Sequence, residues 1–152
     1  HYSSRRQRQM CIRDRQRTQS LDADQAKRLQ WQQACLPDPT LPVGFTAVVS
    51  NSLLHHLHDP AVLWGSLRQL AGADCVVVIH DLRRPSREDQ LQQLVQRHAA
   101  NAPEVLKRDY EASLRAAFSI EEVQQQLHLA QLPELDVMER EDRYLMVWGR
   151  LS

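Results

Sequence analysis

Two runs of apolar residues in the middle of the chain have the length and composition of buried β-strands. Residues 45–50 read Phe-Thr-Ala-Val-Val-Ser, and residues 75–79 read Cys-Val-Val-Val-Ile. Both runs are continuous and rich in β-branched side chains, as in strands that are covered on both faces. Between them, Asp59 as N-cap and Pro60 predict the start of a helix, and Gly72 predicts its end. The pattern therefore predicts a β-α-β unit in a parallel sheet.

The segment after the second run predicts three helices. Ser86 with Asp89 resembles a capping box at the start of the first helix, with aspartate in place of the usual glutamate. Asp109 is placed to cap a second, shorter helix. Ser119 and Glu122 have the spacing of a full capping box and predict the start of the third helix. We expect these helices to cover the sheet.

Segments at both ends of the chain complete the predicted topology. Residues 135–138 and 144–151 predict two strands, and the short charged link between them fits an antiparallel hairpin. Near the N-terminus, residues 21–30 predict a helix, and residues 30–36 predict a short strand that ends before Pro37. The sequence thus predicts an α/β fold whose mostly parallel sheet ends in an antiparallel hairpin.

Composition narrows the class of protein further. The chain has 152 residues, 42% of them hydrophobic, which suits one domain with one core. No apolar run reaches the length of a membrane span, and we expect neither a signal peptide nor a membrane partner. The three cysteines, Cys11, Cys35 and Cys75, have no CxxC spacing. This favours a reduced, cytoplasmic chain over a disulfide framework or a zinc knuckle.

The first fifteen residues differ from the rest of the chain. Residues 5–15 read Arg-Arg-Gln-Arg-Gln-Met-Cys-Ile-Arg-Asp-Arg, which resembles one translated reading frame of a transposase-based sequencing adapter. We therefore interpret residues 1–15 as a non-native head without ordered structure, and residues 16–152 as a truncated domain. The alternative is an arginine-rich arm for nucleic acid or anionic lipid. The head has neither interleaved aromatic residues nor an apolar helical face to support it.

The distribution of charged residues along the chain indicates which class of partner it binds. The formal net charge is zero, but the head holds five arginines and one aspartate. The remaining chain therefore has 14 Lys and Arg against 18 Asp and Glu, a net charge of −4. Such a body argues against a nucleic-acid partner and favours a small-molecule substrate.

Polar residues are concentrated directly after both central strands. The first strand is followed by Asn-Ser-Leu-Leu-His-His-Leu-His-Asp-Pro at 51–60, and the second by His-Asp-Leu-Arg-Arg-Pro at 80–85. The first segment and its strand resemble the fourth-strand motif of class I S-adenosylmethionine-dependent methyltransferases, F-D-x-V-x-x-N-x-x-L-H-H-L-x-D-P, from which Thr46 departs. The second resembles the D-L-x-R-P string that follows the fifth strand in many members. The fitting positions of the first motif are Phe45, Val48, Asn51, Leu54, His55, His56, Leu57, Asp59 and Pro60.

The resemblance implies a Rossmann-like class I methyltransferase fold, here partial because its first strands are missing, and S-adenosyl-L-methionine as cofactor. It places Asn51 and Ser52 against the methionine part of the cofactor and Leu53 beside the sulfonium. Methyl transfer is an in-line displacement at that sulfonium, so it depends on positioning more than on acid–base power. The residues that would border the adenine are Ala34, Cys35 and Leu36.

The glycine-rich cofactor loop of this family has no counterpart in the chain. Gly44, Gly65, Gly72 and Gly149 are isolated, and no second-strand acidic residue is present for the ribose hydroxyls. Both features precede the fourth strand in the family, which agrees with truncation. We therefore expect the parent protein to transfer methyl groups and this chain to be weak or inactive alone.

His55 and His56 are the candidate catalytic residues, because a neutral imidazole can accept a substrate proton. The alternative is that one packs under the strand–helix turn while the other is solvated. His55, His56, His58 and Asp59 also resemble a metal cluster, which makes a zinc-dependent hydrolase an alternative function. Asp59 is better explained as an N-cap, so we expect no metal. A non-catalytic α/β fragment is the other alternative.

Three charged residues and a tyrosine are candidate substrate contacts. Asp81, Arg83 and Arg84 follow the second strand, and arginine binds carboxylates through two parallel hydrogen bonds. The alternative for them is local salt bridging with the acidic residues 88–89. Tyr110 lies in a helical region where the resemblance implies a substrate lid.

Overall fold

The computed structural model describes residues 22, 24, 27–30 and 32–152, in two units, His1–Cys35 and Leu36–Ser152. The predicted head lies outside the described residues, as do residues 21, 23, 25 and 26 of the predicted helix at 21–30. Residues 32–36 form no strand, so that prediction is wrong for them. A strand needs a hydrogen-bonded neighbour, and the described part of the chain supplies none there.

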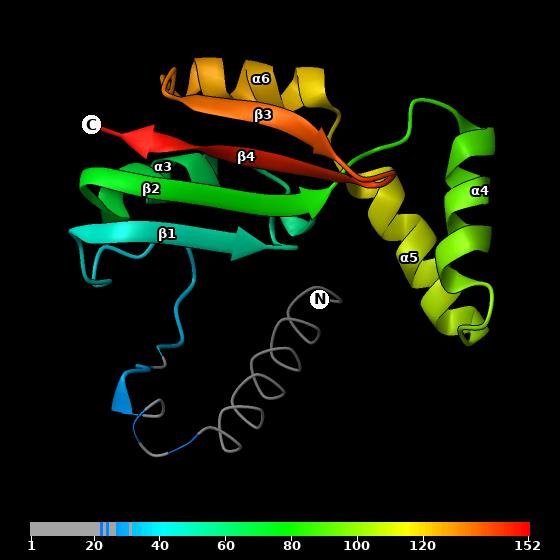
Figure 1. Cartoon of the computed structure of the whole chain (residues 1–152), viewed down its shortest axis with the longest axis horizontal. Coiled ribbons are helices and arrows are strands. Elements are labelled where there is room, and N and C mark those ends of the chain that lie inside the picture. Colours follow the sequence, from blue (N-terminus) through cyan, green and yellow to red (C-terminus); the bar gives the residue numbers. More distant parts are fainter. Residues whose placement is uncertain (1–21, 23, 25–26, 31) are drawn as a thin grey trace. The chain divides into compact units, whose positions relative to one another are not determined.

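The second unit is built on a four-stranded sheet of order β1-β2-β4-β3 (Figure 1). Its strands are β1 (Phe45–Asn51), β2 (Ala71–Leu82), β3 (Leu135–Arg140) and β4 (Tyr144–Leu151). β1 and β2 are parallel, whereas β4 is antiparallel to both β2 and β3. The predicted parallel pair and the predicted C-terminal hairpin are both confirmed.

A short 3₁₀ helix and one α-helix connect the parallel strands, and three α-helices connect β2 to β3. The Ser119 hydroxyl accepts the Glu122 N–H, and the Glu122 carboxylate accepts the Ser119 N–H, which confirms that capping box. The helices are α3 (Ala61–Leu70), α4 (Glu88–Ala99), α5 (Glu104–Ala116) and α6 (Ile120–Leu129).

The ends of α3 differ in part from the prediction. The N-cap of α3 is Pro60 and not Asp59, although the Asp59 carboxylate accepts the Ala61 N–H at 2.9 Å. Gly72, however, is not a C-cap but lies within β2. A Cβ at Gly72 would lie 2.9 Å from the Gly44 backbone, so close strand packing explains this glycine.

The predicted starts of α4 and α5 are wrong. The Ser86 hydroxyl donates to the Gln90 side chain and Asp89 binds Arg87, so neither caps α4. α5 begins directly after Pro103, which leaves Asp109 inside the helix. Proline is favoured at helix starts because its fixed φ suits the first turn, and here it outweighs the aspartate signal.

The main core lies between one face of the sheet and the helices α3 and α6. Alternate residues of β2 point into it, and Trp64 of α3 donates its indole N–H to the Gln126 carboxamide of α6 at 3.1 Å. Its buried residues include Leu54, Leu63, Trp64, Leu67, Cys75, Val77, Ile79, Val123, Leu127, Leu145 and Val147.

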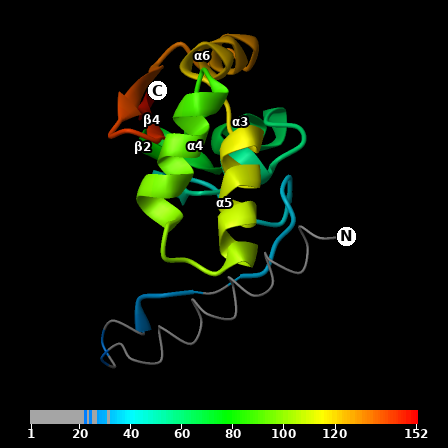
Figure 2. The same ribbon diagram turned by 90° about the vertical axis from the view of Figure 1, so that its right-hand side faces the viewer.

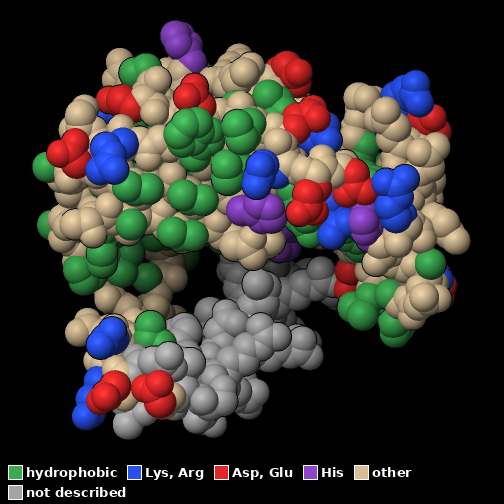
Figure 3. Space-filling view, viewed as in Figure 1, with side chains coloured by type: hydrophobic (Ala, Val, Ile, Leu, Met, Phe, Trp, Pro, Cys, Tyr) green, Lys and Arg blue, Asp and Glu red, His purple; other side chains and the backbone are tan. Residues whose placement is uncertain are grey.

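The opposite face of the sheet is open, which corrects the prediction that β1 is covered on both faces. Val49 is 72% exposed and Trp148 is 44% exposed. In register, Val49, Val78 and Trp148 form one row across β1, β2 and β4, on the face opposite the core. Figure 3 shows hydrophobic side chains gathered over these strands. None of the described helices covers this row.

A second, smaller core fastens the α4–α5 hairpin beyond the strand ends, where the two helices lie side by side (Figure 2). Leu82 of β2, Leu91 of α4 and Leu114 of α5 are buried together there.

Among the described residues, no helix has both the length and the apolar composition needed to cross a bilayer.

Candidate functional site

The carboxyl ends of β1 and β2 lie side by side. Asn51 is paired with His80 across the two parallel strands, and the Ser52 N–H donates to the His80 carbonyl at 2.9 Å. Open α/β sheets bind ligands beyond the carboxyl ends of their strands, so this edge is the candidate site. It brings together the polar segments that follow both strands.

The chain turns sharply at Ser52 as it leaves β1. Ser52 has a φ of 56°, in the left-handed region that residues with side chains rarely adopt. The turn leads into η1 (Leu54–His56), a short 3₁₀ helix. Asn51 is exposed, while Ser52 and Leu53 are half-buried, so these three predicted cofactor contacts form the surface of the strand tip.

Asp81 is buried beside this turn and stabilises it through hydrogen bonds. It is 0% exposed, and its Oδ2 accepts the Leu54 N–H at 2.7 Å. Its Oδ1 accepts the Leu82 N–H at 2.8 Å and lies 2.5 Å from His55 Nδ1. These contacts tie η1 to the end of β2. Asp81 therefore has no surface for the substrate contact that the sequence suggested, and its carboxylate acts within the fold.

The three clustered histidines do not form a metal site. His55 is 8% exposed and packs beneath the turn, with its ring centroid 3.9 Å from that of half-buried His56. His58 is exposed. Among the described residues, no three His, Cys, Asp or Glu side chains gather as metal ligands. The zinc-dependent alternative therefore has no support in this geometry.

Arg83 and Arg84 are engaged in ion pairs. Arg83 Nη1 donates to Glu139 of β3 at 2.8 Å, and the Arg84 guanidinium binds Glu122 of α6. The local-pairing alternative is thus the observed arrangement, although the partners are not residues 88–89. The reason is that the backbone after β2 hydrogen-bonds to the β3–β4 turn and to the start of α6, which aims both side chains that way.

The remaining predicted cofactor residues lie before β1. Ala34 and Cys35 are exposed coil residues at the end of the first unit. Leu36 is half-buried and begins the second unit. Their contact with adenine stays a prediction.

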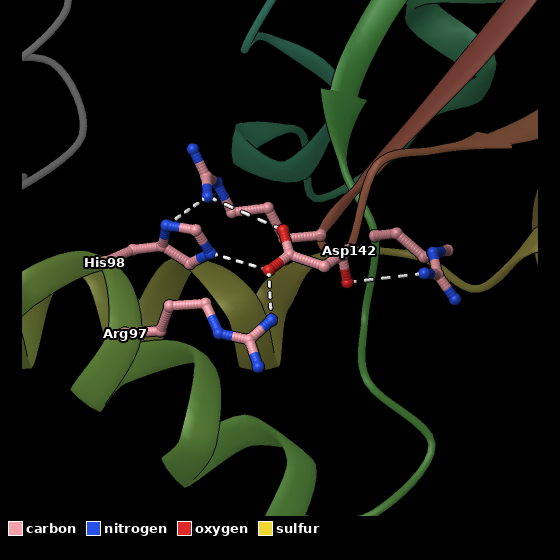
Figure 4. Close-up of polar contacts among 5 residues, drawn as sticks. Arg97, His98 and Asp142 are labelled. Atoms are coloured by element: carbon pink, nitrogen blue, oxygen red, sulfur yellow. Dashed lines mark hydrogen bonds and ion pairs between the residues drawn. The ribbon is translucent and has the colours of Figure 1, made fainter.

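A polar cluster between α4 and the β3–β4 turn was not predicted. Asp142 Oδ2 accepts from Arg97 at 2.9 Å and from His98 Nε2 at 2.7 Å, and Arg143 donates to His98 Nδ1 (Figure 4). The hydrogen bond from His98, with the adjacent arginines, holds the pKa of Asp142 below its usual value. The cluster fastens the α4–α5 hairpin to the sheet. Residues this far apart in sequence gave no local signal of their contact.

Tyr110 packs against the smaller core, and its hydroxyl is buried without a hydrogen-bond partner among the described residues. Burial raises the pKa of Tyr110 to about 12. Tyr110→Phe is expected to stabilise the fold by about 1 kcal/mol, because it removes an unsatisfied buried hydroxyl. Urea unfolding near neutral pH measures this, and a loss of stability in the variant would contradict it.

The same residue predicts a loss of stability in alkali. Unfolded tyrosine ionises near pH 10, whereas folded Tyr110 keeps its proton up to about pH 12. Below pH 10 the folded and unfolded chains both keep this proton, so Tyr110 causes no change of stability with pH. As the pH rises from 10 towards 12, only the unfolded chain loses the proton, and the free energy of unfolding falls. Repeating the unfolding at about pH 11 should show a smaller decline for Tyr110→Phe than for the unaltered chain.

Comparisons with known proteins identify the fold. No protein-family model and no curated protein matches the chain. It resembles the plantazolicin methyltransferase BamL in complex with a triazolic desmethylPZN analog and SAH (TM-score 0.55, 12% identity, 73% of this chain and 55% of that chain). It also resembles a SAM-dependent methyltransferase from Aquifex aeolicus (TM-score 0.53, 14% identity, 84% of this chain and 57% of that chain).

A third similar structure is the plantazolicin methyltransferase BpumL in complex with a monoazolic desmethylPZN analog and SAH (TM-score 0.53, 10% identity, 82% of this chain and 55% of that chain). At these identities the likeness concerns the fold. The chain therefore has a partial, Rossmann-like class I methyltransferase fold. It spans little more than half the length of the methyltransferases it matches.

Proposed function

We propose that this chain is part of an S-adenosylmethionine-dependent methyltransferase that acts on a small molecule. The observation that carries the proposal is the position of the methyltransferase-like sequence motif. Asn51 of this motif lies at the carboxyl end of β1, beside the end of β2, where open α/β sheets bind ligands. A methyltransferase fold supports the same reading.

The strand tip fits one wall of a cofactor site. Asn51 presents its carboxamide at the surface, and Ser52 and Leu53 continue that surface. When bound, S-adenosylmethionine supplies an activated methyl group, and these residues would hold its methionine and sulfonium parts in line with the acceptor. His55 and Asp81 are positioning residues here, because they fix the turn from its buried side. Ala34, Cys35 and Leu36 are proposed to border the adenine.

The chain's fit to the cofactor is partial. None of its four glycines lies in a loop at this edge of the sheet: Gly65 is in α3, Gly72 and Gly149 are in strands, and Gly44 precedes β1. Backbone amides that approach a cofactor closely require such a loop. We therefore infer that further polypeptide completes the site.

The open face of the sheet supports this inference. Among the described strands, β1 has a hydrogen-bonded neighbour on one side only, and Val49 and Trp148 expose large apolar surfaces. Parallel strands normally occur in sheets that are covered on both faces, and large exposed apolar patches mark interaction surfaces. An added strand beside β1, and helices over the row of Val49, Val78 and Trp148, would complete the domain and leave the row of Asn51 and His80 at the strand tips open. This chain alone is then weak or inactive.

Charge favours a small-molecule acceptor. Beyond residue 15 the chain has a net charge of −4, whereas nucleic-acid-binding surfaces depend on clustered lysine and arginine. Arg83 and Arg84 are held in ion pairs with Glu139 and Glu122, which removes the most obvious basic patch near the site.

Calorimetric titration with S-adenosylhomocysteine tests the proposal. We expect no binding heat from the 152-residue chain, and binding by a chain extended with the genomic codons that precede Gln16. In the extended chain, Asn51→Ala should weaken binding by about tenfold, or about 1.4 kcal/mol. Asn101→Ala, at an exposed position between α4 and α5, should not.

Two results would contradict parts of the proposal. Absence of binding by both chains would end the methyltransferase proposal. Tight binding by the 152-residue chain would retain the enzyme but show that no further polypeptide is needed for the cofactor.

A further inference from the structure

His80 is a titratable residue at the strand tips and is not among the predicted site residues. It lies near the end of β2, on the face of the sheet opposite the core, because Ile79 and Asp81 on either side of it point into the core. It is half-buried and directly opposite Asn51 in the β1–β2 register. A side chain here lies beside Asn51, which is predicted to contact the methionine part of the cofactor.

Asn51 fixes the proton on the His80 ring. His80 Nδ1 lies 2.9 Å from the Asn51 Oδ1. A carboxamide oxygen only accepts hydrogen bonds, so Nδ1 must carry the proton. In the neutral ring Nε2 then holds a free lone pair. Within the described part of the chain, Nε2 forms no hydrogen bond that would occupy it.

The other histidines of the site are less suited to accept a proton. His55 has Nδ1 against Asp81 and is 8% exposed, so its ring is a buried part of the turn. His56 stacks on His55, and its surroundings are those of the same turn. His80 is the one of the three whose position is set by a neutral amide and whose ring lies on the open face.

We propose that His80 is the general base of this site and takes the proton from the acceptor during methyl transfer, which rests on the methyltransferase function proposed above. In this step the acceptor oxygen forms a bond to the methyl carbon as the carbon–sulfur bond breaks, and that electron pair stays on sulfur. The acceptor O–H proton moves to His80 Nε2. The half-buried ring then releases this proton to solvent.

The neighbours of His80 indicate an aromatic hydroxyl as the acceptor. The Tyr144 ring lies 4.5 Å from the His80 ring, and the Arg143 guanidinium lies over Tyr144 at 4.6 Å. Met146 and Met138 continue the row of Asn51 and His80 across the open face. A flat apolar ring fits this surface. A phenol, with a pKa of about 10, is also close enough to imidazole for general-base catalysis, whereas an alkyl hydroxyl is far above it.

Nitrogen-15 NMR of the histidine rings tests the assignment on this chain. At a pH where the rings are neutral, we expect His80 in the Nδ1–H form, with its signal assigned by its loss in His80→Gln. In Asn51→Ala the signal should shift to the Nε2–H form that free histidine prefers, while the His55 signal stays unchanged. An Nε2–H form in the unaltered chain, or an unchanged form in Asn51→Ala, would overturn the proposal.

Carbethoxylation by diethyl pyrocarbonate provides a second measurement, because it modifies unprotonated, accessible imidazole nitrogen. Peptide mapping should find His80 modified much faster than His55 and at a rate comparable to exposed His58. Protection of His80 equal to that of His55 would overturn the proposal.

Neither measurement uses the cofactor, so the two proposals fail separately. Binding of S-adenosylhomocysteine together with an Nε2–H ring would overturn the role of His80 alone. An Nδ1–H ring without binding in either chain would overturn the methyltransferase function, and the catalytic role with it.

Discussion

Replacing Asp81 by alanine is expected to lower the free energy of unfolding by about 3–5 kcal/mol, since each buried polar group left without its partner costs about 1–3 kcal/mol. The Asp81 carboxylate accepts the Leu54 and Leu82 N–H groups and contacts His55 Nδ1, and none of it is exposed. Alanine leaves these donors buried without an acceptor. Urea unfolding monitored by circular dichroism measures the change.

Matched variants separate this effect from a general loss of acidic charge. Asp136→Ala removes an exposed aspartate from β3 of the same sheet and should change stability by no more than about 0.5 kcal/mol. Asp81→Asn keeps the shape and should give an intermediate loss, which keeps the test open if the alanine variant does not fold. Combined with His55→Ala, it gives a double-mutant cycle. Equal losses for Asp81→Asn and Asp136→Ala would contradict the role of Asp81.

The burial of Asp81 was within reach of sequence reasoning. Along β2, the residues Cys75, Val77, Ile79 and Asp81 alternate on one side of the strand, and the first three are evidently core residues. Continuing this alternation places Asp81 in the core and His80 on the opposite face. The two residues are neighbours in one polar segment, but strand alternation places Asp81 in the core and His80 on the open face.

Elements with local signals were predicted well. The Ser119–Glu122 capping box located α6, and two apolar runs joined by a charged link located the hairpin. α4 was located less well, because the Ser86 hydroxyl bonds to Gln90 instead of a backbone N–H. A hydroxyl has several partners within reach, and the sequence does not rank them.

Contacts between segments that are distant in the chain could not be predicted from the sequence. Arg97 and His98 meet Asp142 only because the α4–α5 hairpin packs against the β3–β4 turn. The exposure of β1 is a similar case. Its apolar residues indicate that the strand is suited to burial on both faces, but they carry no information on which neighbours are present.

Replacement by alanine is expected to destabilise the chain strongly at one buried tryptophan and only slightly at one exposed tryptophan. Trp64 is 1% exposed and joins α3 to α6 through Gln126, so Trp64→Ala should cost about 3–5 kcal/mol. Trp148 is 44% exposed on the open face, so Trp148→Ala should cost less than about 1 kcal/mol in this chain. Urea unfolding of both variants tests the contrast, and similar losses would contradict the assignment of a single covered face.

Trp148 also reports whether the open face becomes covered. With Trp31 and Trp64 replaced by phenylalanine, its fluorescence in the 152-residue chain should be readily quenched by acrylamide. In the chain extended upstream of Gln16, quenching should fall and emission should shift to shorter wavelength, because added helices would exclude water from the indole. Trp148→Ala should then cost about 3–5 kcal/mol in the extended chain, as expected for a buried tryptophan. Unchanged quenching would show that the added polypeptide lies elsewhere and leaves this apolar face to another occupant.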